Sequence, residues 1–198
     1  MGNTKAFEII SHRAVWSLLV CLIALSFRKE FRSAFKALKN PRTLALLALT
    51  SGLLSANWAI YIWSVTVNRV VEASLGYYMT PLVVVFFGVF VLKEKLRITQ
   101  KLSLGLAAIG VAILTFAFGQ LPLVAFGLAL SWGTYSLIKK RLDAGSLETL
   151  SVEMLFALIP SGIYMFYLMS NNKAEFGSDL WFSIIIMTTG LVTIVPLL

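Results

Sequence analysis

The chain has 198 residues, of which 59% are hydrophobic and 13% are charged, and it carries a net charge of +8. Soluble domains carry about 25% charged residues, so this composition excludes an ordinary soluble enzyme, a disordered tail and a nucleic-acid-binding module. Because a helix that crosses a bilayer takes roughly 20 residues, the length allows about seven or eight membrane spans and no domain outside the membrane.

Seven apolar segments are separated by clusters of charge, and in chain order they cover residues 6–27, 44–67, 73–92, 98–118, 122–138, 149–169 and 180–198. They are apolar on nearly every side and lack a two-residue alternation, which predicts helices rather than barrel strands. The first segment is the weakest, because Glu8, His12 and Arg13 lie in its N-terminal part. The predicted fold class is an all-α integral membrane protein with about seven transmembrane helices.

Basic residues are concentrated in every second connection, at residues 28–42, 93–101 and 139–151. The other connections hold only Arg69 and Lys173 as basic residues. Since cytoplasmic loops carry an excess of Lys and Arg, the three basic connections are predicted to lie in the cytoplasm. The net charge therefore indicates membrane topology rather than an acidic partner. The basic residues in these connections are Arg28, Lys29, Arg32, Lys36, Lys39, Arg42, Lys93, Lys95, Arg97, Lys101, Lys139, Lys140 and Arg141.

This orientation gives both ends of the chain an unusual appearance. The N-terminus would lie outside without a signal peptide, and the last apolar segment runs to Leu198 without a flanking Lys or Arg. We therefore expect at least one further helix before residue 6 and more of the protein after residue 198. The alternative is a seven-span protein with unusual ends.

Polar side chains are costly in hydrocarbon, so their spacing along the apolar segments is informative. Four groups, made up of polar side chains, prolines and small residues, each follow one helical face. Each group predicts either the lining of a cavity or hydrogen bonds that hold helices together. The groups are Thr50, Asn57, Tyr61, Ser64 and Asn68 in the second segment, Ser74, Tyr78, Pro81 and Gly88 in the third, Glu153, Ala157, Pro160 and Tyr164 in the sixth, and Thr189, Thr193 and Pro196 in the last.

Three further ionisable residues have alternative interpretations. Glu72 follows Arg69 near the predicted outer boundary, which favours a local ion pair, while a carboxylate at a cavity mouth would bind a proton or a cationic substrate. Glu8 and His12 are neighbours four residues apart. They either pair inside the helix bundle or lie at the outer interface, and the interface is favoured because His12 is two residues from the uncharged run.

The sequence contains no constellation typical of a soluble enzyme. It lacks GxGxxG, Walker, CxxC and HExxH patterns, and one His with one Cys cannot build a usual zinc site. Cys21 lies in an apolar run and is interpreted as a structural thiol. We therefore expect no enzymatic activity, no cofactor and no metal.

Three motifs together resemble one known family. Residues 8–17 match E-x-x-x-H-R-x-x-W-S, residues 57–63 match N-W-x-x-Y-I-W, and residues 72–82 resemble E-A-S-L-G-Y-F-I-N-P-L. The last motif differs at Tyr78, Met79 and Thr80, which replace Phe, Ile and Asn. These motifs are similar to those of the RarD group of EamA transporters, in the drug/metabolite transporter superfamily.

The resemblance implies a fold of ten helices in two inverted repeats of five. Residues 1–121 would be the remainder of the first repeat, helices 2–5, and residues 122–198 the start of the second, helices 6–8. It implies a multi-pass secondary transporter of the bacterial inner membrane that moves a small metabolite or drug-like solute by alternating access. A small-molecule substrate, a coupled proton or other ion, and the lipid bilayer would be its partners.

The expected substrate-binding residues combine the polar stripes with the third motif. The alternative function is a non-transporting fragment of such a transporter, and an intramembrane enzyme or an assembly subunit is less favoured. The expected substrate-binding residues are Asn57, Tyr61, Ser64, Glu72, Ser74, Tyr78, Pro81 and Thr193.

Overall fold

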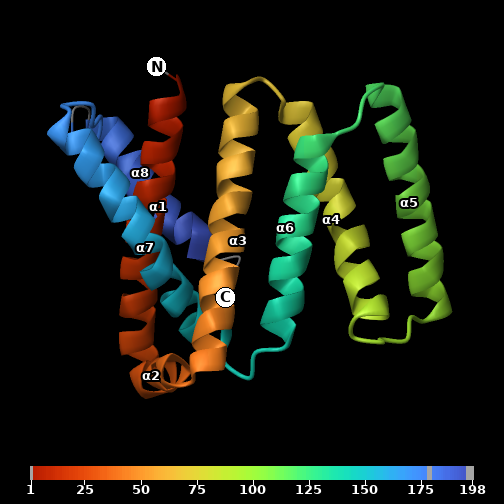
Figure 1. Cartoon of the computed structure of the whole chain (residues 1–198), viewed down its shortest axis with the longest axis horizontal. Helices are drawn as coiled ribbons and strands as arrows, with labels where there is room; N and C mark the ends of the chain where they lie inside the picture. The colour runs from red at the N-terminus through yellow and green to blue at the C-terminus, as the bar shows by residue number, and fades with distance from the viewer. Residues whose placement is uncertain (1, 178–179, 195–198) are drawn as a thin grey trace. The chain divides into compact units, whose positions relative to one another are not determined.

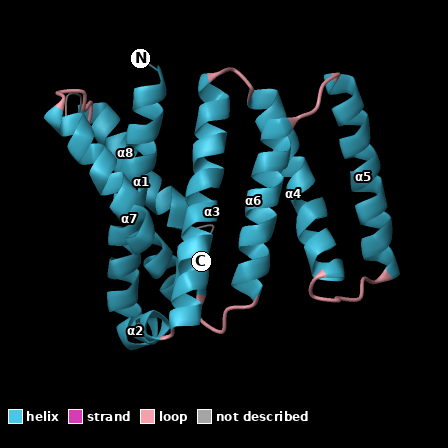
Figure 2. Cartoon of the chain, viewed as in Figure 1, coloured by secondary structure: helices cyan, strands magenta, loops and turns pink. Residues whose placement is uncertain are grey.

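The computed structural model describes residues 2–177 and 180–194, and its ordered elements are helices (Figures 1 and 2). Five of these helices are long and apolar enough to cross a membrane, namely α1 from Phe7 onward, α3, α4, α5 and α7. The all-helical, multi-span fold class is therefore confirmed. The helices in these residues are α1 (Gly2–Arg28), α2 (Phe31–Lys39), α3 (Pro41–Thr66), α4 (Val70–Phe90), α5 (Ile98–Phe118), α6 (Leu123–Lys140), α7 (Ser146–Ser170) and α8 (Leu180–Ile194).

Two of the seven predicted spans differ from the expectation. The segment 122–138 does form α6, but this helix ends in Lys139 and Lys140 and is not among the five candidate spans. The last segment forms α8, a shorter apolar helix of 15 residues in the part described. Residues 195–198 of that predicted span lie outside the described residues.

The helix boundaries follow from particular residues. The Asn40 side chain accepts hydrogen bonds from the backbone amides of Arg42 at 3.0 Å and Thr43 at 3.4 Å, which caps the N-terminus of α3. Asn68 follows α3 with a φ of 59° and Asn172 follows α7 with a φ of 51°. Asn tolerates this left-handed conformation better than most residues, so it suits the end of a helix.

The described chain divides by packing into two compact units. The first unit comprises Met1–Ser55 with Leu142–Leu198, and the second comprises Ala56–Arg141. In the first, α1 packs against α7 and α8, and in the second, α4 packs against α6 and α5. This division describes contacts and does not test the expected repeats at 1–121 and 122–198, which stay a prediction.

Glycine permits close helix contacts within each unit. In the first unit, a Cβ atom added to Gly190 of α8 would lie 2.5 Å from the backbone carbon of Trp16 of α1. In the second, a Cβ on Gly133 of α6 would lie 2.5 Å from Val83 of α4. Small residues of this kind let membrane helices approach until their backbones nearly touch, which maximises van der Waals contact.

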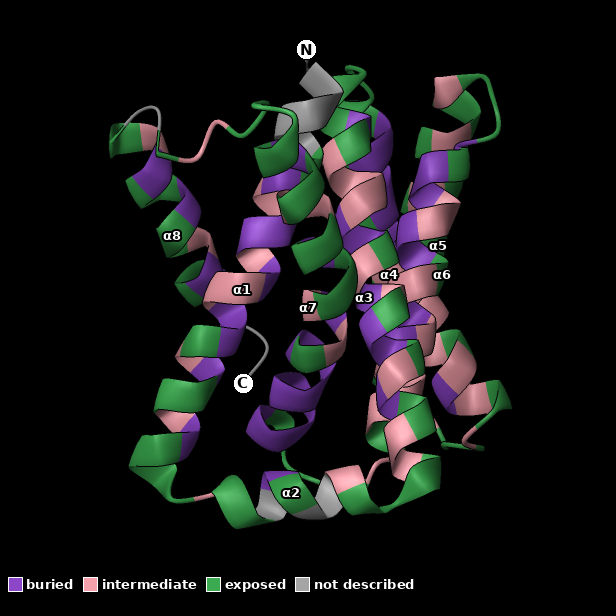
Figure 3. Cartoon of the chain, turned by 60° about the vertical axis from the view of Figure 1, so that its left-hand side comes forward, coloured by how far each residue is buried: buried purple, intermediate pink, exposed green. Residues whose placement is uncertain are grey.

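The helix α2 lies within the segment 28–42, for which the sequence predicts only a basic connection. It lies across the ends of α1 and α7 rather than along them (Figure 3). Ala34 is buried, whereas the rings of Phe31 and Phe35 and the side chain of Arg32 are exposed. Exposed aromatic and basic side chains on a short amphipathic helix are typical of a helix in the membrane interface.

Candidate functional site

In the second unit, Asn57 connects α3 to α6. Its amide nitrogen donates to the carbonyl oxygen of Leu128 at 3.1 Å and to the hydroxyl of Ser131 at 2.9 Å. The side chain is 7% exposed, so these bonds form away from solvent. Hydrogen bonds between membrane helices stabilise their packing by roughly 0.6 kcal/mol each, and up to about 1.7 kcal/mol. Asn57 therefore has a structural role, and among the described residues none donates to its Oδ1.

Tyr61 and Ser64 continue the polar face of α3 beyond Asn57. The Tyr61 ring is half-buried and meets the Tyr77 ring of α4 edge to face, with centroids 5.8 Å apart. Ser64 is fully buried, and its hydroxyl donates to the Tyr61 carbonyl at 2.6 Å. Ser64 thus satisfies its own helix, whereas Tyr61 presents a ring at the helix interface.

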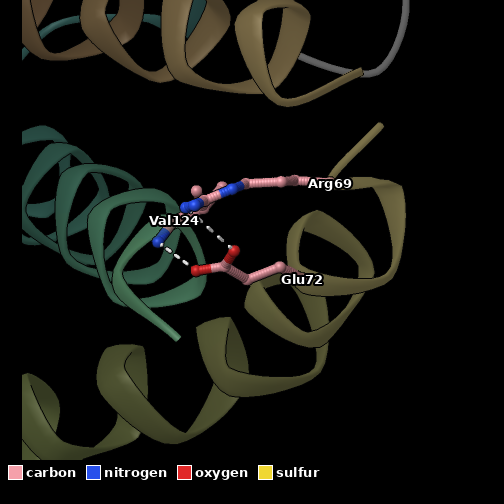
Figure 4. Close-up of polar contacts among 3 residues, drawn as sticks. All are labelled: Arg69, Glu72 and Val124. Atoms are coloured by element: carbon pink, nitrogen blue, oxygen red, sulfur yellow. Dashed lines mark hydrogen bonds and ion pairs between the residues drawn. The ribbon is translucent and has the colours of Figure 1, made fainter. Parts of the chain in front are cut away.

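Glu72 of α4 caps the start of α6, as Figure 4 shows. Its carboxylate is 2% exposed, and Oε1 accepts a hydrogen bond of 2.7 Å from the backbone amide of Val124. Oε2 lies 3.6 Å from the guanidinium of Arg69. The first amides of a helix lack intrahelical partners and carry the positive end of its dipole, so a carboxylate is stabilised there. The local ion pair expected from the sequence is present, together with this cap.

Ser74, Tyr78 and Pro81 face away from this cap. All three are exposed, Tyr78 by 66%, and Ser74 donates to the carbonyl of Val70 in its own helix. Ser74 and Tyr78 line a shallow pocket of about 150 Å³ with Leu114 and Phe118 of α5. Glu72 instead bonds to α6, so the structure does not bring the two parts of this motif to one site. The helix α4 continues from Val70 to Phe90 through Pro81.

Thr193 belongs to the first unit. It is 2% exposed, donates to the Thr189 carbonyl at 2.7 Å, and accepts a hydrogen bond from Nε of Arg13. The contact joins α8 to α1 and brings an intramembrane guanidinium to a hydroxyl. The other seven predicted residues lie in the second unit.

The predicted stripe of the sixth segment places a buried carboxylate on α7, outside the predicted substrate-binding residues. Glu153 is fully buried, and its Oε1 accepts a hydrogen bond of 2.7 Å from the Thr50 hydroxyl. Ser51 donates to the Glu153 carbonyl at 2.6 Å. Glu153 lies about 10 Å from the N-terminal end of α7, at a rise of 1.5 Å per residue. The polar stripe of α3 is therefore divided, because Thr50 packs in the first unit and Asn57 in the second.

Glu8 and His12, which the sequence favours as interfacial residues, are buried inside the helix bundle of the first unit. Glu8 is 1% exposed and His12 is 5% exposed, both within the first unit. Oε1 of Glu8 accepts hydrogen bonds of 2.9 Å from the backbone amides of Glu175 and Phe176. This loop follows α7 and folds over the carboxylate, a contact that the sequence of α1 alone does not reveal. No cluster of His, Cys, Asp and Glu suited to a metal ion occurs in the described residues.

The motif residues described above hold the helices together. Comparison with known proteins identifies the family to which the chain belongs. A sequence profile of EamA-like transporters matches residues 1–116. The chain belongs to the EamA-like transporter family. Its first and second motifs supply Glu8 and Asn57, and its third supplies Glu72, so each motif of the family contributes one buried tertiary contact.

Relatives in this family share roughly two fifths of their aligned residues with the chain. The chain is 41% identical to protein RarD of Streptomyces exfoliatus over 97% of its own length and 61% of that protein. It is 37% identical to an uncharacterized transporter of Vibrio cholerae over 100% of the chain and 66% of the relative. It is 36% identical to protein RarD of Salmonella typhi over 98% of the chain and 66% of that protein. The chain thus spans less than two thirds of each.

No solved structure gives a significant match. Family membership, bacterial relatives and five candidate spans together identify a multi-pass protein of the bacterial inner membrane. The tryptophans and tyrosines of the helices suit that environment, because their amphipathic rings favour the membrane–water interface.

Proposed function

We propose that this protein is a secondary transporter that moves a small metabolite or drug-like solute across the inner membrane by alternating access. The observation that carries the proposal is that a member of the EamA-like family buries Glu8, Glu72 and Glu153 in its candidate spans. Ionisable residues in a membrane are costly and mark substrate or ion pathways by default. The name of the Vibrio cholerae relative, a transporter, supports the same activity.

We propose that transport is driven by a gradient of protons or another ion and uses two inverted repeats of five helices. Residues 1–121 belong to the first repeat in this proposal and residues 122–198 to the second. The match of the family profile to residues 1–116 supports the extent of the first repeat. Such repeats place a substrate site near the middle of the membrane, where irregular or polar helices meet.

Asn57 and Tyr61 are the central substrate contacts in this proposal. Asn57 already uses its amide hydrogens on α6, which leaves its Oδ1 as an acceptor for a substrate donor. The half-buried Tyr61 ring offers an apolar face and a hydroxyl. The further proposed contacts of the second unit are Ser64, Glu72, Ser74, Tyr78 and Pro81, and Thr193 is the proposed contact of α8.

The test is flux through the 198-residue chain reconstituted in liposomes with an imposed proton gradient. Labelled chloramphenicol, leucine and ethidium serve as probes because they are neutral, zwitterionic and cationic. We expect gradient-driven movement of at least one probe, and at least a tenfold loss of it in Asn57→Ala and Tyr61→Ala. Asn171→Ala is the matched control, because Asn171 is exposed at the end of α7 and bonds only to its own helix.

Stability must be measured on the same preparations, since Asn57 also joins two helices. Loss of two hydrogen bonds at roughly 0.6 kcal/mol each lowers the melting temperature by only a few degrees. A chain that moves none of the probes contradicts the transport proposal. Unchanged flux in both variants contradicts the assignment of Asn57 and Tyr61.

A further inference from the structure

A pocket of about 170 Å³ opens beside Glu8 in the first unit. Its walls come from α1, from the last turns of α7 and from the loop that follows α7. Glu8 and His12 are its polar members, and Met165, Met169 and Phe176 form much of its apolar lining. The predicted substrate residues do not include any residue of this pocket.

Only one of the two oxygens of the Glu8 carboxylate has hydrogen-bond partners in this position. Oε1 accepts the two backbone hydrogen bonds from the loop, while Oε2 is buried and has no hydrogen-bond partner in the described part of the chain. Burying a carboxylate is costly unless both oxygens are bonded or a cation is nearby. An unsatisfied oxygen beside a pocket therefore indicates a missing donor.

The neighbouring basic groups do not supply that donor. The His12 ring stacks on Phe176, with centroids 4.2 Å apart and planes inclined by 27°. Arg13 follows His12 in sequence, but its Nε donates to Thr193 of α8. Among the described residues, no ion pair to Glu8 is formed. The site thus combines a carboxylate with one unbonded oxygen, and the neighbouring His12 ring, with an aromatic and thioether wall.

We propose that this pocket binds a small organic ammonium ion. The ammonium group donates a hydrogen bond to Oε2 of Glu8, and its positive charge compensates the buried carboxylate. The face of Phe176 attracts the same cation, and the flexible Met165 and Met169 side chains accommodate its alkyl part. A bare proton would satisfy Oε2 as well, but it would not use the volume or the apolar lining.

Binding at this pocket does not depend on transport. The extension that the bound amine is the transported solute rests on the proposed function and names a substrate class for it. The two are separable, because a binding measurement needs neither a gradient nor a sealed vesicle. Binding without flux leaves the pocket assigned and contradicts the transport proposal alone.

The test uses the 198-residue chain in nanodiscs of phosphatidylcholine, which has no net charge and does not concentrate cations. Calorimetric titration compares n-butylammonium with 1-butanol, a neutral analogue of the same shape. We expect n-butylammonium to bind at least tenfold more tightly than 1-butanol. In Glu8→Gln that preference should disappear, because the amide keeps an acceptor for the loop amides but loses the charge.

Asp143→Asn is the matched control, since Asp143 is an exposed carboxylate in the same unit. It should bind n-butylammonium as the unmodified chain does. Phe176→Leu should weaken binding severalfold while keeping the apolar wall. Tryptophan fluorescence melting establishes that each variant is folded. Equal binding of the amine and the alcohol, unchanged binding in folded Glu8→Gln, or no binding to the unmodified chain overturns the proposal.

Discussion

Replacing Glu72 tests whether one buried carboxylate holds α4 to α6. In Glu72→Ala the backbone amide of Val124, a buried residue, loses its acceptor at 2.7 Å. In Glu72→Gln the side-chain carbonyl can still accept this bond, and only the charge is lost. Arg69→Ala removes the other partner, whose side chain is 49% exposed and 3.6 Å away. The three variants therefore separate the hydrogen bond, the charge and the ion pair.

The magnitudes follow from burial. An unpaired buried amide costs about 1–3 kcal/mol, and loss of a favourable charge at a helix N-terminus costs about 0.3–1 kcal/mol more. We expect Glu72→Ala to lower the free energy of unfolding by about 2–3 kcal/mol and Glu72→Gln by about 1 kcal/mol. Arg69→Ala should lower it by about 0–1 kcal/mol, because a half-exposed ion pair is screened by solvent.

Thermal unfolding in a mild detergent, followed by tryptophan fluorescence, measures these differences. For a chain of this size, 1 kcal/mol corresponds to about 2–4 °C. The melting temperature should fall by about 4–12 °C in Glu72→Ala and by about 2–4 °C in Glu72→Gln. Equal losses in Glu72→Ala and Glu72→Gln would refute the reasoning, because the charge rather than the bond to Val124 would then account for the effect.

Three other substitutions test the helix contacts in the same assay. Gly190→Ala should destabilise the chain by about 1–3 kcal/mol, because its Cβ would lie 2.5 Å from the Trp16 backbone. Gly162→Ala is the control and should be neutral or stabilising, because no atom lies within 4 Å of its Cβ. A larger loss of stability in Gly162→Ala than in Gly190→Ala contradicts the close packing of α8 on α1. Thr50→Val should lower the free energy of unfolding by about 1–2 kcal/mol, because it removes the 2.7 Å hydrogen bond to Glu153. Thr50→Ser keeps the hydroxyl and should keep most of the stability. Equal losses of stability in the two variants would show that the methyl group matters instead of the hydrogen bond. Lys140→Ala should change stability by less than about 1 kcal/mol, since its 2.9 Å ion pair with Glu94 is exposed, and a larger loss would assign that pair a structural role.

The burial of Glu8 and His12 on α1 shows why a sequence pattern does not predict which side of a membrane helix faces the protein. In a soluble helix the apolar face points to the core, so spacing reveals orientation. In a membrane helix both the lipid-facing and the protein-facing sides are apolar, and the pattern does not separate them. Glu8 and His12 therefore resembled interfacial residues, although the loop after α7 covers Glu8 through two backbone amides. Because residues 8 and 175 are far apart in the sequence, no local sequence pattern predicts their contact.

The sequence by itself determined the fold class, most helix positions and the family, because transfer of an apolar segment into hydrocarbon depends on its own composition and length. It also identified Asn57 and Glu72 as unusual residues. The partners of these residues were decided only by tertiary structure: the Leu128 carbonyl and Ser131 for Asn57, and the Val124 amide for Glu72. Hydrogen bonds between helices depend on rotation and register, which uniformly apolar sequences leave unspecified. The same reason explains why Ser74 and Tyr78 share a sequence motif with Glu72 but face α5.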